Sequence, residues 1–405
     1  MVHLEGAGLV EDAGDRLGRS REGTRPPAEG QLAQGDPPPP AETQERLPSV
    51  VGGDVDVGEV KVPHRAPRSY QRSALRVTPS CGTSDHDVTA THRGRFAPSP
   101  TGRLHLGNAW AAVLGWLWAR SEGGEFLLRI EDLDTARSRR ELTDALLADL
   151  AWLGLGFDGV PTFQSRRLEL YRAAFERLRA TGRIYPCFCT RSEIARAVSA
   201  PHGPADEGPR YPGTCLALSD EERTERARTR PPAWRFRPHE GLTEVHDLLH
   251  GTFVQDVARE VGDFVVLRND GVPSYQLAVV VDDADTGITH VLRGDDLLGS
   301  TPRQIELCEA LGLPVPVYAH VPLLLGPDGK RLAKRAGTPS LAELRERRIV
   351  PERLVGLLAG WAGLGDGRPV GLDELVPRFS LGRLPRAPIA VDPEQVGSVL
   401  FGPPA

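Results

Sequence analysis

The chain has 405 residues, of which 40% are hydrophobic and 26% are charged, a composition typical of a globular protein. No apolar run approaches the ~20 residues that a membrane-spanning helix needs, and the N-terminus lacks the basic and apolar segments of a secretory signal. The formal net charge of −6 neither indicates nor excludes a nucleic-acid-binding protein, because a local basic surface matters more than the total. We expect a cytoplasmic protein without membrane contact, and a monomer.

Residues 1–92 differ from the rest of the chain. They contain stretches such as GDPPPPAE and VVGGDVDVGEV, few aromatic residues and no sustained helical or alternating apolar pattern. Such a segment cannot bury enough apolar surface to offset the entropy lost on ordering. We predict a disordered N-terminal extension over 1–92, or an upstream stretch that is not translated in the cell.

A parallel α/β sheet is predicted where order begins, at Arg93. A short strand over 95–97 leads into a turn rich in proline and glycine. An apolar helix over 106–122 follows, and a second strand over 125–130 ends at Glu131. Strand, turn, helix and strand in this order are typical of a parallel sheet, whose active edge lies at the carboxyl ends of the strands.

Periodicity predicts the remaining elements. Helices are expected over 139–155, 166–182, 301–313 and within 340–364. Strands are expected in the apolar, β-rich runs over 263–268, 275–285, 289–294 and 319–325. The stretch 185–238 is irregular, and 379–397 forms a tapering end. We predict that two halves of a catalytic domain (93–186 and 239–335) flank an insert (187–238), and that a helical C-terminal segment (336–405) follows.

The string FAPSPTGRLHLGN follows the first predicted strand. Pro98, Pro100 and Gly102 impose a rigid turn that lets the backbone approach a ligand, and His105 lies where the next helix starts. A helix N-terminus offers free N–H groups and the positive end of the helix dipole, which suits a phosphate. A histidine there can donate a hydrogen bond to charge that develops on a phosphoryl group. A helix cap or a solvated side chain is the competing interpretation of this histidine.

Two lysines stand in the segment GPDGKRLAKR, Gly326 to Arg335. The chain has only one other lysine, Lys61, among its 49 Lys and Arg residues. An ammonium is a compact point charge on a flexible stem, whereas a guanidinium is a planar fork. The change of residue type therefore indicates phosphate chemistry at Lys330 and Lys334. A pair of solvated loop charges is the alternative.

Charged residues at the predicted strand ends indicate a polar pocket. Glu131 ends a buried strand beside Asp132 and Asp134, and acids in such places bind Mg²⁺ or a substrate ammonium, or cap the next helix. Arg293 stands in VLRGDD, where it binds either a substrate or one of the two following aspartates.

Three of the five cysteines, Cys187, Cys189 and Cys215, lie close together in the predicted insert. Thiolates at this spacing fit a tetrahedral zinc site, with Tyr211 or His202 as the fourth ligand. A metal would also supply folding energy that this poorly apolar insert lacks. An odd and small number of cysteines does not suit a disulfide scaffold, which favours a reducing compartment. Buried cysteines without a ligand are the alternative.

The string FAPSPTGRLHLGN and the lysine segment together resemble the two signatures of class I aminoacyl-tRNA synthetases, specifically of the glutamyl type. The resemblance extends over about 93–364. Asn108 stands where a second histidine is frequent, and Arg331 and Ala333 replace a lysine and a serine of the second signature. Lys334 is the residue that this signature carries over directly.

The resemblance implies an α/β enzyme with a class I synthetase-like Rossmann nucleotide-binding domain, a zinc-bearing insert and a short helical C-terminal segment. It implies that His105 and Lys334 are catalytic and that Lys330 is a candidate helper. The residues expected to bind ATP, with its Mg²⁺, are Pro98, His105, Gly107, Asn108 and Lys334. The residues expected to bind L-glutamate are Arg95, Phe96, Ala97, Ser99, Glu131, Tyr275 and Arg293. Relatives with Cys-x-Cys and Tyr-x₃-Cys support Tyr211 as the ligand that completes a zinc site with Cys187, Cys189 and Cys215.

These residues suit amino-acid activation, in which a carboxylate attacks the α-phosphate of ATP and releases pyrophosphate. The carboxylate is ionised near neutral pH, so the step needs no general base. Catalysis then consists of positioning the reactants and neutralising phosphate charge. Two arginines in one pocket imply an acidic amino acid, because each can form a bidentate pair with a carboxylate.

Only residues 336–405 follow the lysine segment, which is enough to contact an RNA stem but not for a separate anticodon-binding domain. This feature resembles the glutamyl-Q tRNA(Asp) synthetases. It implies transfer of glutamate to queuosine at the wobble position, with the anticodon loop of tRNA(Asp) as partner. The alternatives are a truncated synthetase that charges a tRNA 3′ end, a nucleotidyltransferase that shares the first signature, and a non-catalytic zinc-dependent RNA-binding module.

Overall fold

The computed structural model describes residues 91–197, 210–332 and 338–402, all of which belong to the compact unit of residues 61–405. Most of the predicted N-terminal extension lies outside the described residues, as do His202 and Lys334. The folded chain starts slightly before the predicted boundary at Arg93. His92 is 7% exposed, and its ring stacks on that of His290 with 4.0 Å between the centroids.

Parallel strands form the centre of the fold. Three of them pair in the order β1 (Arg93–Phe96), β2 (Glu125–Ile130) and β3 (Thr162–Phe163). A second group pairs in the order β9 (His290–Gly294), β10 (Val317–Val321), β6 (Thr243–Asp247) and the antiparallel β7 (Gly251–Gln255). The two groups lie side by side, because the Thr289 N–H donates to the Arg93 carbonyl at 3.0 Å, next to β9 and within β1.

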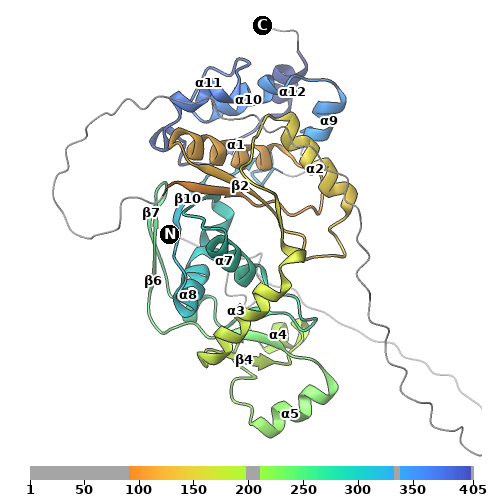
Figure 1. The fold of residues 1–405 in the computed structure, drawn as a ribbon, viewed down its shortest axis with the longest axis vertical. Coiled ribbons are helices and arrows are strands. Elements are labelled where there is room, and N and C mark those ends of the chain that lie inside the picture. The colour runs from red at the N-terminus through yellow and green to blue at the C-terminus, as the bar shows by residue number, and fades with distance from the viewer. Residues whose placement is uncertain (1–90, 198–209, 333–337, 403–405) are drawn as a thin grey trace, which may run out of the picture. The chain divides into compact units, whose positions relative to one another are not determined.

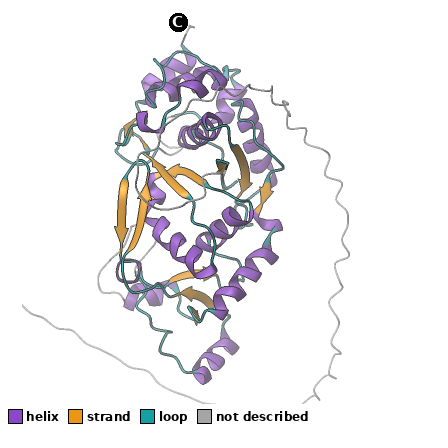
Figure 2. Cartoon of the chain, turned by 60° about the vertical axis from the view of Figure 1, so that its left-hand side comes forward, coloured by secondary structure: helices purple, strands orange, loops and turns teal. Residues whose placement is uncertain are grey.

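Helices cover both faces of these strands (Figures 1 and 2). On one face, α1 (Leu106–Ser121) packs against β1, β2 and β9 and is buried along most of its length. On the other face lie α7 (Tyr275–Asp285) and α8 (Thr301–Leu311), and α3 (Leu168–Ala180) packs against α7. Two separate apolar clusters follow from this layering, one around α1 and one around α7 and α8.

The prediction of a strand over 275–285 is wrong, because these residues form α7. The hydroxyl of Ser274 caps the helix by accepting a hydrogen bond from the Leu277 N–H. The apolar residues at 277–281 are all buried. A run that is buried on every side shows neither alternation nor a helical stripe, so its sequence pattern does not distinguish a buried strand from a buried helix.

The predicted insert at 187–238 has more regular structure than expected. Its described residues include the helices α4 (Arg191–Ala197) and α5 (Asp220–Thr229). A three-stranded antiparallel sheet pairs β4 (Ile184–Cys187), β5 (Ala233–Phe236) and β8 (Phe264–Leu267). Because β8 lies beyond residue 238, this sheet crosses the predicted boundary. The short α6 (Val257–Glu260) precedes β8.

The C-terminal segment is helical, as predicted, and packs on the same side as α1. Its helices are α9 (Leu341–Glu346), α10 (Pro351–Trp361), α11 (Leu372–Leu375) and α12 (Pro393–Phe401). α9 contacts α2 (Arg140–Trp152), and α11 contacts α1. Their apolar side chains belong to the core that surrounds α1, so this segment and the first strands share one core.

The tapering end predicted over 379–397 is instead ordered. β12 (Ile389–Ala390) pairs in parallel with β11 (Leu324–Leu325). The lysine segment starts directly after β11. α12 begins soon afterwards, at Pro393, and packs against α10. No helix in the described part of the chain is long and apolar enough to cross a bilayer.

Candidate active site

A cavity of about 630 Å³ opens where β1, β2 and β9 end and α1 begins. It brings together all the predicted ATP and glutamate residues that the structure describes. These are Arg95, Phe96, Ala97, Pro98, Ser99, His105, Gly107, Asn108, Glu131, Tyr275 and Arg293. Lys334 lies outside the described residues, but Arg331 and Leu332 of the same segment line the cavity. Lys330 is exposed and is not among the lining residues.

His105 caps α1, which was the competing interpretation of this residue. Its Nδ1 accepts a hydrogen bond from the Gly107 N–H at 3.1 Å, and its own backbone N–H donates to Asn108 Oδ1 at 3.0 Å. In the neutral ring the proton therefore sits on Nε2, the remaining nitrogen. One imidazole can thus cap α1 through Nδ1 and donate a hydrogen bond to a phosphate through Nε2. A Cβ at residue 107 would lie 3.0 Å from the His105 ring, so glycine permits this arrangement.

The same cap limits what Asn108 can do. Its Oδ1 accepts the hydrogen bond that closes the capping box, so only its amide N–H groups remain as donors to a ligand. The predicted contact between Asn108 and ATP would therefore use Nδ2.

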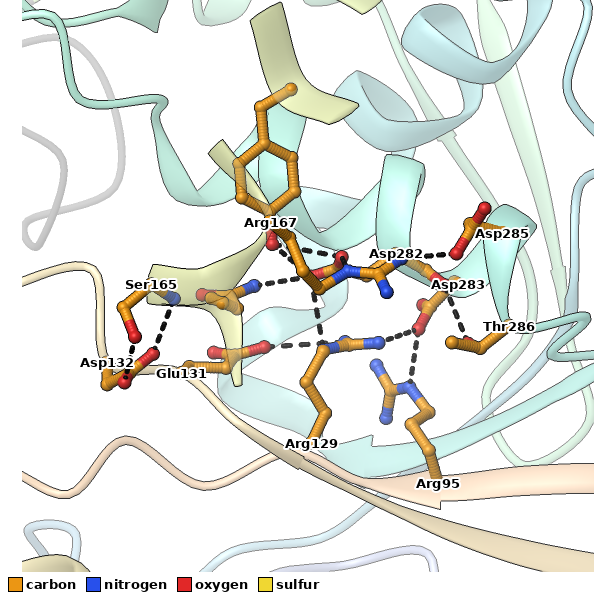
Figure 3. Close-up of polar contacts among 12 residues, drawn as sticks. Arg95, Arg129, Glu131, Asp132, Ser165, Arg167, Asp282, Asp283, Asp285 and Thr286 are labelled. Atoms are coloured by element: carbon orange, nitrogen blue, oxygen red, sulfur yellow. Dashed lines mark hydrogen bonds and ion pairs between the residues drawn. The ribbon is translucent and has the colours of Figure 1, made fainter. Parts of the chain in front are cut away.

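Asp283 of α7 joins two arginines from adjacent strands, Arg95 and Arg129, of which Arg95 lines the cavity (Figure 3). Its Oδ1 accepts from Arg95 Nε at 3.2 Å and from Arg129 Nη1 at 2.5 Å. Arg129 Nη2 also donates to Glu131 Oε1 at 3.4 Å. Arg95 and Glu131 are therefore linked through a buried arginine that the sequence reasoning did not select.

The charges in this network set the protonation of its carboxyl groups. Burial raises the pKa of Glu131, and the positive charges of Arg129 and Arg95 oppose this effect only in part. Burial acts in the same direction on Asp283, but Arg129 and Arg95 outweigh it and lower the pKa of Asp283. Asp283 is thus the ionised partner of both arginines. Glu131 is the carboxyl group that gains most from a further cation, such as the ammonium of an amino acid.

Arg293 lines the same cavity from the end of β9. Its Nε donates to His320 Nε2 at 3.0 Å, and its Nη2 donates to Thr301 Oγ1 at 2.8 Å. Its Nη1 lies 3.4 Å from the hydroxyl of Tyr275. Tyr275 and Arg293 both line the cavity, as predicted.

The predicted alternative, an ion pair between Arg293 and a following aspartate, does not occur among the described residues. Asp296 instead pairs with Arg331 of the lysine segment. This pair lines the cavity and connects the end of β9 to the segment that carries the second signature.

Two acidic residues near Glu131 have structural partners. Asp132 accepts from the Ser165 N–H at 2.8 Å and from the Ser165 hydroxyl at 2.6 Å. Asp134 pairs with Arg137 at 2.6 Å. Both carboxylates therefore organise the loops beyond β2, whereas Glu131 lines the cavity.

Cys187, Cys189 and Cys215 form the predicted thiol cluster. Their Sγ atoms lie within 4.8 Å of one another, and the Sγ atoms of Cys189 and Cys215 are 3.5 Å apart. Tetrahedral zinc with Zn–S bonds of about 2.3 Å places sulfur atoms roughly 3.8 Å apart. The donor set and spacing therefore fit a structural zinc ion.

Tyr211 directs its hydroxyl at this thiol cluster. The hydroxyl oxygen lies 3.6 Å from Cys189 Sγ and accepts from the Cys215 N–H at 2.8 Å. The guanidinium of Arg235 lies 3.8 Å from the centre of the Tyr211 ring and covers it. Tyr211 thus lies in contact with two members of the thiol cluster, Cys189 and Cys215. The other candidate for the fourth ligand, His202, lies outside the described residues.

Sequence reasoning missed Arg129, Asp283, Asp247 and His320, which hold the predicted residues in place. A weak signal existed in two of them. Arg129 interrupts the apolar strand EFLLRI, and His320 interrupts the apolar run around AHVPLLL. A charged or polar residue inside a buried strand needs a partner, although the sequence does not say which one.

Comparison with protein families gives a match to the family described as tRNA synthetases class I (E and Q), catalytic domain, over residues 91–376. A protein of Symbiobacterium thermophilum named Glutamyl-Q tRNA(Asp) synthetase is 53% identical over 321 residues, covering 76% of this chain and 98% of that protein. A protein of Oleidesulfovibrio alaskensis named Glutamate--tRNA ligase is 46% identical over 307 residues, covering 75% of this chain and 64% of that protein.

A solved structure is also similar in fold. A glutamate tRNA ligase from Elizabethkingia meningosepticum, in complex with its amino acid, has a TM-score of 0.66 and 30% identity. The match covers 76% of this chain and 68% of that one.

Proposed function

This chain belongs to the class I tRNA synthetases of the E and Q type, and we propose that it activates L-glutamate with ATP and transfers it to queuosine in the anticodon loop of tRNA(Asp). As a member of this family it is a ligase that forms an aminoacyl adenylate. We propose three further points: that the amino acid is glutamate, which residues bind it, and which RNA nucleoside receives it.

The placement of Arg95, Glu131 and Arg293 around one cavity carries the choice of glutamate. Two buried guanidinium groups favour an amino acid with a side-chain carboxylate over its amide, because the amide lacks the charge that would offset their burial. We assign the α-ammonium to Glu131, whose carboxyl group favours a further cation, and the side-chain carboxylate to Arg95.

The phosphates of ATP belong at the N-terminus of α1. Free N–H groups and the helix dipole favour negative charge there, and His105 Nε2 carries the proton that a phosphate oxygen would accept. The α-carboxylate of glutamate then attacks the α-phosphate, the bond to the β-phosphate breaks, and pyrophosphate leaves with its Mg²⁺. Lys334 is proposed to follow the charge onto the departing phosphates, because an ammonium on a flexible stem can move with them.

Queuosine is proposed as acceptor rather than a tRNA 3′ end. The relative named Glutamyl-Q tRNA(Asp) synthetase is matched over 98% of its length, whereas the relative named Glutamate--tRNA ligase is matched over 64%. Similarity to the first extends through the whole of that protein, which supports the same acceptor here.

Transfer of labelled glutamate to tRNA(Asp) with and without queuosine tests the proposal. We expect label only on the queuosine-containing tRNA, and, after ribonuclease digestion, in the anticodon-loop fragment and not in the 3′-terminal adenosine. Label in the 3′-terminal adenosine would instead support the alternative, a truncated synthetase that charges a tRNA 3′ end. Absence of glutamate-dependent pyrophosphate exchange, with and without tRNA, would overturn glutamate activation itself.

A zinc ion held by Cys187, Cys189, Tyr211 and Cys215 is proposed to be structural. When bound it would supply folding energy to the insert, whose thiol cluster is surrounded by few apolar side chains.

A further inference from the structure

Arg293 is held by a relay of side chains that begins outside the cavity. Three neighbouring strands end side by side here, and each contributes one member: Asp247 ends β6, His320 lies in β10, and Arg293 lies in β9 opposite His320. All three are at most 5% exposed. Burying two charges with an imidazole between them costs folding free energy unless every polar atom has a hydrogen-bond partner.

The Asp247 carboxylate is the fixed end of the relay. Its Oδ1 accepts from the backbone N–H groups of Leu249 and His250, each at 2.9 Å. Its Oδ2 accepts from His320 Nδ1 at 2.6 Å and from the His320 backbone N–H at 3.0 Å. With four donors around it, this carboxylate is held in one orientation by the turn between β6 and β7 and by His320. It therefore fixes the proton of His320 on Nδ1.

His320 Nε2 is consequently an acceptor, and Arg293 Nε donates to it at 3.0 Å. Arg293 Nη2 donates to Thr301 Oγ1 at 2.8 Å and lies 3.5 Å from the Leu297 carbonyl oxygen. Nε and Nη2 thus both bind protein atoms. The nitrogen left toward the cavity is Nη1, whose partner among the described residues is the Tyr275 hydroxyl at 3.4 Å.

We propose that Asp247 and His320 are positioning residues that fix the orientation of Arg293. In this orientation Arg293 presents a single nitrogen, Nη1, to the amino-acid substrate, beside the Tyr275 hydroxyl. It does not form a bidentate pair with the substrate. The inference rests on the proposed function, because it concerns the pocket assigned to glutamate. It replaces the expectation that both arginines form bidentate pairs. Among the described residues, Arg95 contacts the protein through its Nε. Its two terminal nitrogens therefore remain for a carboxylate.

Substitutions at His320 separate positioning from folding. The amide oxygen of His320→Gln reaches about as far as Nε2 and can still accept from Arg293, whereas the shorter His320→Asn can keep only the bond to Asp247. His320→Leu removes both of these contacts, together with the 3.2 Å contact between Nε2 and the Thr301 hydroxyl. His246→Leu is the matched control, because His246 is the neighbour of Asp247 in β6 and its side chain is 78% exposed.

Glutamate-dependent pyrophosphate exchange gives KM for glutamate and for ATP separately. We expect His320→Leu and His320→Asn to raise KM for glutamate at least tenfold, about 1.4 kcal/mol, and to leave KM for ATP within twofold. His320→Gln should recover most of the glutamate affinity, and His246→Leu should match the wild type. An unchanged KM for glutamate in folded His320→Asn, or equal increases for both substrates in every variant, would overturn the proposal.

The nitrogen chemical shifts of His320 in the wild-type protein provide a measurement that does not depend on activity. We expect a neutral ring with the proton on Nδ1 and none on Nε2. A proton on Nε2 would overturn the relay, since Nε2 could not then accept from Arg293. If the wild type shows no exchange with glutamate, the proposed function fails, and the position of this proton alone decides whether the relay holds.

Discussion

Asp283 holds Arg95 through the Nε side of its guanidinium, at 3.2 Å. The contact is between groups that are both buried, so Arg95 has one orientation in the cavity before any substrate binds. Its terminal nitrogens are then aligned for a carboxylate without further loss of side-chain freedom.

Removing the charge of Arg95 should therefore act on glutamate and not on ATP. We expect Arg95→Ala to lower kcat/KM for glutamate by about 10- to 100-fold, since a hydrogen bond to a charged group contributes ~1.5–3 kcal/mol. KM for ATP in pyrophosphate exchange should change little. Arg368→Ala is the control, because Arg368 is a surface arginine paired with Asp366. Unchanged glutamate kinetics in Arg95→Ala would remove the acidic-substrate assignment.

Asp283→Asn should cost stability as well as activity. It leaves the guanidinium groups of Arg95 and Arg129 without their shared carboxylate in a buried place, and loss of one partner from a buried ion pair costs about 3–5 kcal/mol. Urea unfolding measures this loss directly. Asp366→Asn, at an exposed pair, should change the free energy of unfolding by less than about 1 kcal/mol. Equal stabilities of the two variants would contradict the buried network.

His105 combines a cap with a proposed catalytic donor, and two substitutions separate these roles. Asparagine can still accept from the N–H groups of the first turn, whereas alanine cannot, so His105→Ala should lose about 1 kcal/mol of stability and His105→Asn much less. Both should lower kcat for pyrophosphate exchange by about tenfold or more, because neither carries the Nε2 proton. Full activity in His105→Asn would limit the histidine to capping.

Metal analysis tests the thiol cluster. We expect about one zinc per chain in purified protein, and its loss in Cys215→Ala together with a lower unfolding temperature. Cys308→Ala is the control, because Cys308 is buried in α8 and burial raises its pKa to about 12, which makes it unreactive. Wild-type protein without zinc, whose three cluster thiols react freely with a thiol reagent, would refute the site.

The stacked pair His92 and His290 should make the fold sensitive to acid. Burial, assisted by the charge of His290, lowers the pKa of His92 to about 3, whereas an unfolded histidine titrates near 6.5. The unfolded state therefore binds more protons between these values, and stability falls as the pH drops through that window, by up to ~1.4 kcal/mol per unit.

His92→Phe keeps an aromatic ring against His290 and Trp118 and removes the proton that His92 binds in the unfolded state. Between about pH 7 and pH 5, its free energy of unfolding should fall less than that of the wild type, by about 1–2 kcal/mol. His246→Phe, at an exposed histidine, should fall as the wild type does. Parallel curves for His92→Phe and the wild type would show that the pair does not control acid stability.

Local strings, together with the family signatures that they resemble, were sufficient to select the cavity residues named above. The turn after β1, the start of α1 and the end of β2 are adjacent in sequence, so FAPSPTGRLHLGN and Glu131 could be placed together from the order of elements alone. The residues that orient them could not be found in this way. Asp283 reaches Arg95 across a sequence separation of 188 residues, and Asp247 reaches His320 across 73. Such pairs depend on which strands become neighbours, and no local pattern contains that information.

The errors in secondary structure have a related cause. α7 is buried on all sides, so its valines give no periodic signal, and the packing around it decides in favour of a helix. β12 is only two residues long and exists because β11 lies beside it. The antiparallel sheet of the insert likewise needs β8 from outside the predicted boundary.

The pairing of β11 with β12 has a consequence for how such an enzyme could diversify. β11 leads into the lysine segment, and Leu332 at its far side donates back to the Leu324 carbonyl at 2.8 Å. The strand that supports it, β12, belongs to the last part of the chain, which also shares a core with α1. The C-terminal segment is thus not an independent module that could be exchanged without disturbing the rest of the fold. A recombination event at the end of the second signature would separate the lysine segment from its support, so a new RNA specificity would have to arise by substitutions on this scaffold or by additions beyond α12.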